Sequence, residues 1–200
     1  MDPCWRKMIF IVVILAIAIP ISSGHRRRSR RLDDSNKDDT EKYLRDICSK
    51  TDKPDMCWNI LKSELHKFDD DSDDIDIIDG VIELAIEKSK EIHDKLDQWF
   101  SDSNDENLKK KYHSCSKNYN EVDRNLEEAH RNLDSDDYRR ISDQIDDAED
   151  ELDKCKQEFG SDSFDPGHVG DRNNELGLYL DIVRVAADCL EDYHADEDHN

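Results

Sequence analysis

Cys48 and Cys57 lie nine positions apart in the stretch CSKTDKPDMCW, and such a cysteine pair can bind a metal, carry out redox chemistry or form a disulfide. Structural zinc sites use closer pairs such as C-x2-C together with a second pair of ligands, and no second Cys or His pair completes such a site here. The C-x-x-C spacing of redox proteins is also absent. We therefore expect Cys48 and Cys57 to form a disulfide.

The acidic stretch from Asp69 to Gly80, DDDSDDIDIIDG, is the second candidate for chemistry. An EF-hand calcium loop needs Gly at its sixth position and Glu at its twelfth, but these positions hold Asp74 and Gly80. The eight histidines are scattered, and no serine-nucleophile, phosphate-binding or dinucleotide-binding sequence pattern occurs. We therefore expect a protein that is not an enzyme and that uses no metal and no cofactor.

The first 24 residues have the features of a secretory signal peptide. A basic start at Arg6 and Lys7 precedes 14 apolar residues at 8–21, and small residues follow at 22–24. Fourteen residues are too few for a bilayer core, which needs about 20. An uncleaved anchor is the alternative, and the basic segment HRRRSRR at 25–31 favours it. We predict cleavage after residue 24, secretion, and no stable association with a membrane.

Five cysteines remain after this cleavage, which in an oxidising compartment predicts two disulfides and one further thiol. They are Cys48, Cys57, Cys115, Cys155 and Cys189. Cys189 is expected to be a small buried apolar residue of the last helix, with an intermolecular disulfide as the alternative.

Acidic side chains dominate the rest of the chain. Residues 32–200 carry 50 acidic and 22 basic side chains, a net charge of −28, against −22 for the whole sequence. This charge should repel acidic polysaccharide and the phosphates of nucleic acid, so no nucleic-acid partner is expected. It suits a basic protein partner, although acidity that serves only solubility is an equal alternative.

The organisation of the chain predicts one all-α domain at residues 40–195. Residues 25–39 are polar without periodicity and are predicted to be a disordered arm. Residues 40–70 should form a short helical hairpin, with Pro54 in the first turn of its second helix. Residues 74–193 show four longer segments with heptad-like apolar stripes, joined mostly by short links, which predicts an up-down-up-down four-helix bundle.

The second and third of these segments are joined by a short link at 134–137. In an antiparallel hairpin, residues at equal distances from the link face each other. The two apolar stripes pair off in this way from Leu133 and Tyr138, beside the link, to Cys115 and Cys155, farther along. Facing residues of packed helices come within the Cα separation of about 4.4–6.8 Å that a disulfide requires. We therefore predict a second disulfide, Cys115–Cys155.

The chain resembles the plant invertase/pectin methylesterase inhibitor family over about residues 40–193. The segments that carry the resemblance are CSKTDKPDMCWNIL, DENLKKKYHSCSKNY, DDYRRISDQIDDAEDELDKCKQEF and ELGLYLDIVRVAADCL. The resemblance implies the same bundle, hairpin and two disulfides. It also implies an extracellular, cell-wall protein that covers the active-site cleft of a carbohydrate-active enzyme in a 1:1 complex, and we expect it to be monomeric when free.

The same resemblance indicates which enzyme is inhibited. Invertase-directed members often carry Pro-Lys-Phe at the entry to the second bundle helix, where this sequence has Glu106, Asn107 and Leu108. Pectin methylesterase is therefore the expected target, with acid invertase as one alternative and a non-inhibitory acidic wall protein as another. The segment Asp105 to Lys109 is the candidate target contact, although an ordinary helix cap and first turn would explain the same residues.

Overall fold

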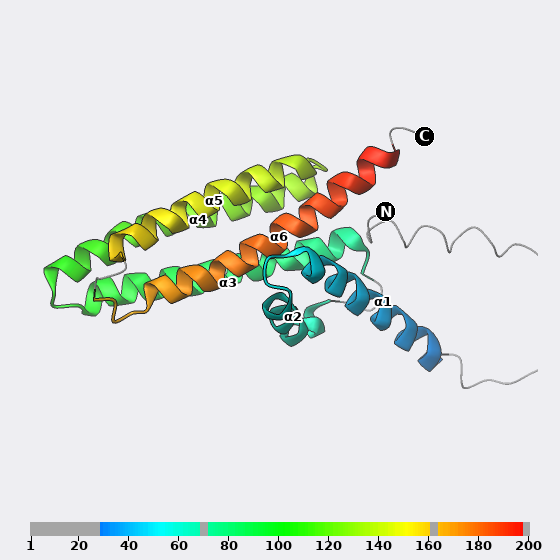
Figure 1. The fold of residues 1–200 in the computed structure, drawn as a ribbon, viewed down its shortest axis with the longest axis horizontal. Helices are drawn as coiled ribbons and strands as arrows, with labels where there is room; N and C mark the ends of the chain where they lie inside the picture. Colours follow the sequence, from blue (N-terminus) through cyan, green and yellow to red (C-terminus); the bar gives the residue numbers. More distant parts are fainter. Residues whose placement is uncertain (1–28, 69–71, 161–163, 198–200) are drawn as a thin grey trace, which may run out of the picture.

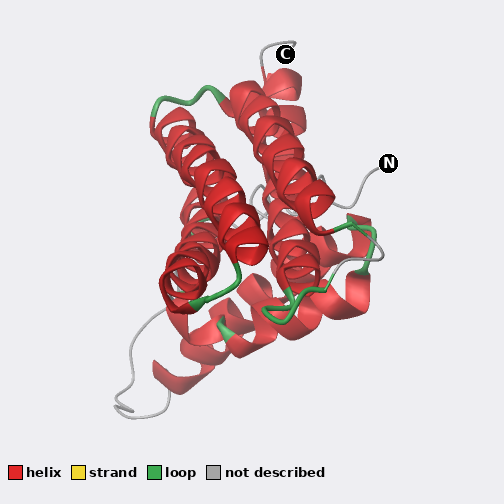
Figure 2. Ribbon diagram, turned by 90° about the vertical axis from the view of Figure 1, so that its left-hand side faces the viewer, coloured by secondary structure: helices red, strands yellow, loops and turns green. Residues whose placement is uncertain are grey.

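The computed structural model describes residues 29–68, 72–160 and 164–197, and within these ranges all regular structure is helical (Figures 1 and 2). The elements are α1 (Ser29–Lys50), α2 (Pro54–Ser63), the 3-10 helix η2 (Leu65–Lys67), α3 (Asp74–Asp102), α4 (Glu106–Asp134), α5 (Tyr138–Phe159) and α6 (Val169–Glu197). The predicted all-α class is confirmed.

Helices α3 to α6 form the predicted four-helix bundle. Each of the four helices contacts two of the other three, because α3 and α5 both pack against α4 and α6. The α3–α4 link and the α5–α6 connection lie at one end of the bundle, and the α4–α5 turn lies at the other (Figure 1). Successive helices therefore run in opposite directions, as the short links require.

The polar residues at the helix ends explain where the long helices begin and stop. The Asp73 side chain accepts hydrogen bonds from the backbone N–H groups of Ile75 and Asp76, and the Asp76 side chain accepts from the Asp73 N–H. This reciprocal capping box fixes the start of α3. Helix α5 ends at Gly160, whose φ of 52° is a backbone conformation that favours glycine.

The hairpin of α1 and α2 packs beside α6 rather than against all four bundle helices. Regular structure begins earlier than expected, because α1 starts at Ser29 and thus includes residues 29–39, which the sequence analysis assigned to a disordered arm. The sequence has no Gly or Pro between Gly24 and Pro54, so no helix-breaking residue interrupts residues 29–39. Polar composition alone does not distinguish a helix from coil. The predicted signal peptide and residues 25–28 lie outside the described residues.

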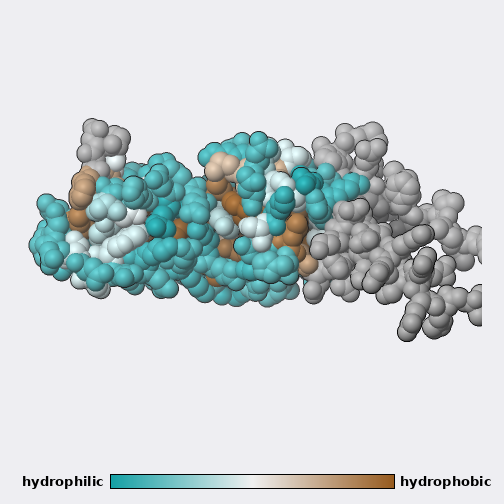
Figure 3. All heavy atoms as spheres, turned by 90° about the horizontal axis from the view of Figure 1, so that it is seen from below, coloured by the Kyte–Doolittle hydropathy of each residue, from teal (hydrophilic) through white to brown (hydrophobic). Residues whose placement is uncertain are grey.

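The apolar stripes form one buried core. Its largest fully buried side chains include Tyr119, Ile78, Ile92, Leu126, Ile141 and Ile145. In α6, buried residues cover a wide face that includes Leu180, Ile182, Val183 and Cys189, because this helix contacts α1 and α2 in addition to α3 and α5. The face seen in Figure 3 is mostly hydrophilic, and apolar side chains appear on it as separate patches.

Candidate functional site

The first predicted disulfide, Cys48–Cys57, is confirmed. It joins the end of α1 to the first turn of α2, with the two Cα atoms 5.4 Å apart. Arg45 and Trp58 add a second contact between these helices, because the guanidinium carbon lies 3.6 Å from the centroid of the indole ring. The disulfide therefore braces a hairpin that is too small to have a large core of its own.

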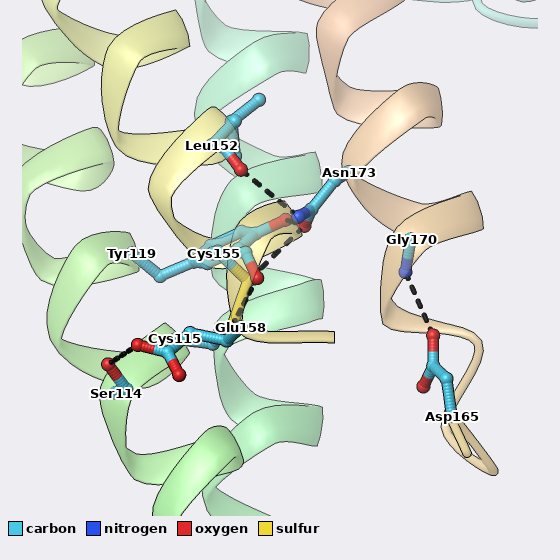
Figure 4. Close-up of a disulfide and its surroundings, with 9 residues drawn as sticks. All are labelled: Ser114, Cys115, Tyr119, Leu152, Cys155, Glu158, Asp165, Gly170 and Asn173. Atoms are coloured by element: carbon cyan, nitrogen blue, oxygen red, sulfur yellow. Dashed lines mark hydrogen bonds between the residues drawn. A yellow bond between two sulfur atoms is a disulfide. The ribbon is translucent and has the colours of Figure 1, made fainter. Parts of the chain in front are cut away.

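The second predicted disulfide, Cys115–Cys155, is also confirmed and lies inside the bundle (Figure 4). Both cysteines are fully buried, and their Cα atoms are 4.6 Å apart across α4 and α5. Asn173 of α6 lies beside them, where it accepts a hydrogen bond from the Tyr119 hydroxyl at 2.8 Å and donates one to the Leu152 carbonyl at 3.3 Å. This amide thus connects three helices at the level of the disulfide.

The hydroxyl of Tyr119 is held as a neutral donor at this place. Burial raises the pKa of Tyr119 far above its usual value, and the nearby Asp123 carboxylate adds to the effect. The neutral hydroxyl can therefore donate to Asn173 over the whole physiological pH range. Sequence reasoning missed this pair, because the partner of the Tyr119 hydroxyl depends on how α6 packs against α4.

The candidate target contact, Asp105 to Lys109, lies at the start of α4. The Asp105 side chain caps the helix, accepting from the N–H groups of Asn107 at 2.8 Å and Leu108 at 3.2 Å. Residues 105–107 are exposed, whereas Leu108 and Lys109 are half-buried. The cap accounts for Asp105 without a partner, and the role of the segment in target binding stays a prediction.

A chain of hydrogen bonds centred on His93 crosses the seam between α3 and α4. His93 Nδ1 lies 2.7 Å from Asp123 Oδ2, and its Nε2 lies 3.2 Å from Ser116 Oγ. Ser116 donates to Asp97 Oδ1 at 2.7 Å, and Ser89 donates to Asp123 Oδ1 at 2.6 Å. Sequence reasoning missed this cluster, although Ser89, His93 and Asp97 recur every four residues and therefore share one face of α3.

Ser116, His93 and Asp123 have the connectivity of a hydrolase triad, but the arrangement does not support nucleophilic catalysis. The single Ser116 hydroxyl hydrogen points to Asp97, because a carboxylate can only accept. Ser116 is 8% exposed in the interior of α4, where the backbone N–H groups are used within the helix and cannot form an oxyanion hole. The cluster therefore holds α3 against α4.

Cys189 is buried and lies outside both disulfides, as expected. Lys50 Nζ donates to its Sγ at 3.3 Å, which links α6 to the end of α1.

A hollow of about 450 Å³ lies close to these two elements, between α5, α6 and the α1–α2 turn. Some of its charged groups have partners within the protein. Arg184 binds Glu149 and Asp146, and the Asp52 N–H donates to Asp181. The hollow has charged side chains of both signs, among them Lys53, Asp153 and Lys156, and this mixture does not indicate one class of ligand.

Within 29–68, 72–160 and 164–197, no cluster of three or more His, Cys, Asp or Glu side chains could hold a metal ion. In the same part of the chain, no helix combines the length and apolar composition needed to span a bilayer.

The fold and its covalent links define a disulfide-braced helical bundle with an N-terminal helical hairpin. The family model described as plant invertase/pectin methylesterase inhibitor matches residues 42–177. The chain therefore belongs to this family, whose members are inhibitors rather than enzymes.

Solved structures agree with this assignment. Mutant form A of a pectin methylesterase inhibitor from Arabidopsis is 21% identical and superposes with a TM-score of 0.63, covering 71% of this chain and 93% of that one. A pectin methylesterase inhibitor from Arabidopsis thaliana is 22% identical with a TM-score of 0.55, covering 74% and 95% respectively. At these identities the similarity establishes the fold. Among curated proteins, none matches this chain significantly.

Proposed function

We propose that this protein is a secreted inhibitor of pectin methylesterase in the plant cell wall. It would act as a monomer that covers the active-site cleft of the enzyme in a 1:1 complex. The observation that carries the proposal is the family match over residues 42–177, on a bundle that superposes with two pectin methylesterase inhibitors.

The charge of the protein supports a basic target. Residues 32–200 carry a net charge of −28, and much of it lies on exposed helix faces, for example at Asp143, Asp146, Asp147 and Asp150 of α5. Opposite charge accelerates the encounter of two proteins and is screened by salt. Inhibition should therefore weaken as salt rises when the esterase is basic, and change little when it is not.

The test is a titration of several purified pectin methylesterases with the oxidised protein starting at residue 25, with an acid invertase assayed side by side. The proposal expects saturating loss of demethylation at one equivalent for at least one esterase, and no loss of sucrose hydrolysis. Loss of sucrose hydrolysis alone would replace it with the invertase alternative. No loss in either assay, with both disulfides verified, would leave the non-inhibitory wall protein.

The start of α4 offers a sharper comparison between the two enzymes. Replacing Glu106, Asn107 and Leu108 with Pro, Lys and Phe introduces the triplet found in invertase-directed relatives. Pro is tolerated at the first position of a helix, so the variant should fold. If this segment selects the target, the variant gains inhibition of invertase or loses inhibition of the esterase. An unchanged profile in both assays would exclude it as the determinant.

A further inference from the structure

We propose that the outer face of the first half of α4 binds a linear polycarboxylate, namely a de-esterified stretch of pectin. The choice of polymer rests on the proposed function, because a pectin methylesterase produces carboxylates on this polymer. The site is the basic stripe formed by Lys110, His113 and Lys117, which lies at the end of the bundle farther from α1 (Figure 1).

The charge of this segment is opposite to that of the protein as a whole. Residues 107–120 contain four lysines and no Asp or Glu, and this is the longest stretch without an acidic residue after Asp34. Net charge describes the field far from a protein, whereas a bound polymer meets the local charge, since screening acts within about 8 Å at physiological ionic strength. The repulsion expected from the overall charge therefore does not extend to this face.

Within the described part of the chain, no ion pair involves these four lysines, and Lys111 lies over the Phe159 ring, 5.2 Å from its centroid. Three carboxylates of the surrounding segments accept from neutral donors instead. Asp105 caps α4, Asp97 accepts from Ser116, and Glu158 of α5 accepts from Ser114 at 2.7 Å. By contrast, Lys88, Lys90 and Lys95 of α3 are each bound to glutamates. The exposed ammonium groups of Lys110 and Lys117 are therefore available to an external partner.

The shape of the stripe fits an extended polymer better than a protein. Lys110 and Lys117 are two turns apart, about 10.5 Å along the convex ridge of one helix. A protein interface of about 800 Å² per partner would also cover the acidic flanks on α3 and α5, where an acidic partner would be repelled. A single polysaccharide strand is narrow enough to contact the ridge alone.

An aromatic side chain lies beside the stripe. The Phe100 ring is 39% exposed and packs against the His113 ring, with their centroids 5.3 Å apart. Its exposed part would give the apolar side of a sugar ring a surface to pack on, near the ammonium groups that would pair with the carboxylates. The stripe thus offers both kinds of contact that an acidic sugar chain needs.

The experiment is a calorimetric titration of the full secreted chain with an oligogalacturonate long enough to reach from Lys110 to Lys117, and with its fully methyl-esterified form. Two double charge reversals are compared, K110E/K117E in the stripe and K62E/K156E elsewhere on the exposed surface. Both change the net charge equally, and both are checked for unchanged helix content and melting temperature. Surface ion pairs of this kind predict about a five- to tenfold loss of affinity in K110E/K117E and less than about a twofold change in K62E/K156E.

Binding of the acid form, no binding of the ester and a loss specific to K110E/K117E would support the proposal. Equal losses in both variants, equal binding of the ester, or no binding at low salt would overturn it. If K110E/K117E weakens inhibition of the esterase while oligogalacturonate binding is absent, the stripe contacts the enzyme and the carbohydrate proposal fails. Because this titration contains no enzyme, its failure leaves the proposed inhibition untouched.

Discussion

Gly167 packs directly against the ring of Trp99, so that a Cβ atom at position 167 would lie 3.0 Å from two of the ring carbons. The Trp99 ring is held in place by Tyr112, whose ring centroid is 5.7 Å away, and by the Arg172 guanidinium at 5.3 Å. This contact fixes the α5–α6 connection to the ends of α3 and α4.

Gly167→Ala should therefore destabilise the protein, because the indole cannot move without losing these contacts. We expect a loss of about 1–3 kcal/mol in the free energy of unfolding, measured with denaturant. The matched control is Gly177→Ala in the interior of α6, where a Cβ would meet nothing within 4 Å. It should stabilise by about 0.5–1 kcal/mol, and the same sign for both variants would contradict this explanation.

Removing Cys115–Cys155 should cost more stability than removing Cys48–Cys57. The two disulfides span 40 and 9 positions, and the loop-entropy model gives about 4 and 2.7 kcal/mol respectively. Double Cys→Ala variants, compared by denaturant unfolding, test this order. The C48A/C57A variant should also lose amide protection mainly in α1 and α2, and a uniform loss throughout the bundle would show that the hairpin is not a separate unit.

Asp123→Ala should weaken the seam between α3 and α4. The change removes the acceptor of His93 and of Ser89 in a partly buried place, so we expect a loss of about 2 kcal/mol in the free energy of unfolding. Glu127→Ala is the control one turn farther along α4. Its pair with Lys90 is about half exposed and 3.4 Å long, so the change should be within about 0.5 kcal/mol. Equal effects would mean that the His93 cluster adds no more than a surface pair.

Tyr138 predicts a pH dependence on the alkaline side. Burial, together with its hydrogen bond to Asp136 at 2.8 Å, raises the pKa of Tyr138 from 10.0 to about 12. Because the folded state holds the neutral phenol more strongly than the unfolded chain does, this contribution to stability is complete below pH 10 and is lost as pH rises toward 12. Between a pH below 10 and a pH near 12, the free energy of unfolding should fall more in the wild type than in Tyr138→Phe. Parallel curves would show that another group is responsible.

The apolar stripes of the sequence were sufficient to predict the bundle and the Cys115–Cys155 disulfide. Cys115 and Cys155 could be paired because the link at 134–137 is short, so distance from the turn fixes which residues of α4 and α5 face each other. Cys48 and Cys57 are close in the chain and needed no further information. These predictions succeed because helical period and chain connectivity are local properties.

Contacts between polar groups were decided by the tertiary structure. The hydrogen bonds of His93 depend on the rotation of α3 against α4, and those of Asn173 depend on where the first turns of α6 meet α4 and α5. The lysines of α4 were visible in the sequence, but only the structure shows that Asp97 and Glu158 accept hydrogen bonds from Ser116 and Ser114. A sequence pattern identifies which face of a helix is apolar, whereas the partners of a polar side chain follow from how the helices pack in three dimensions.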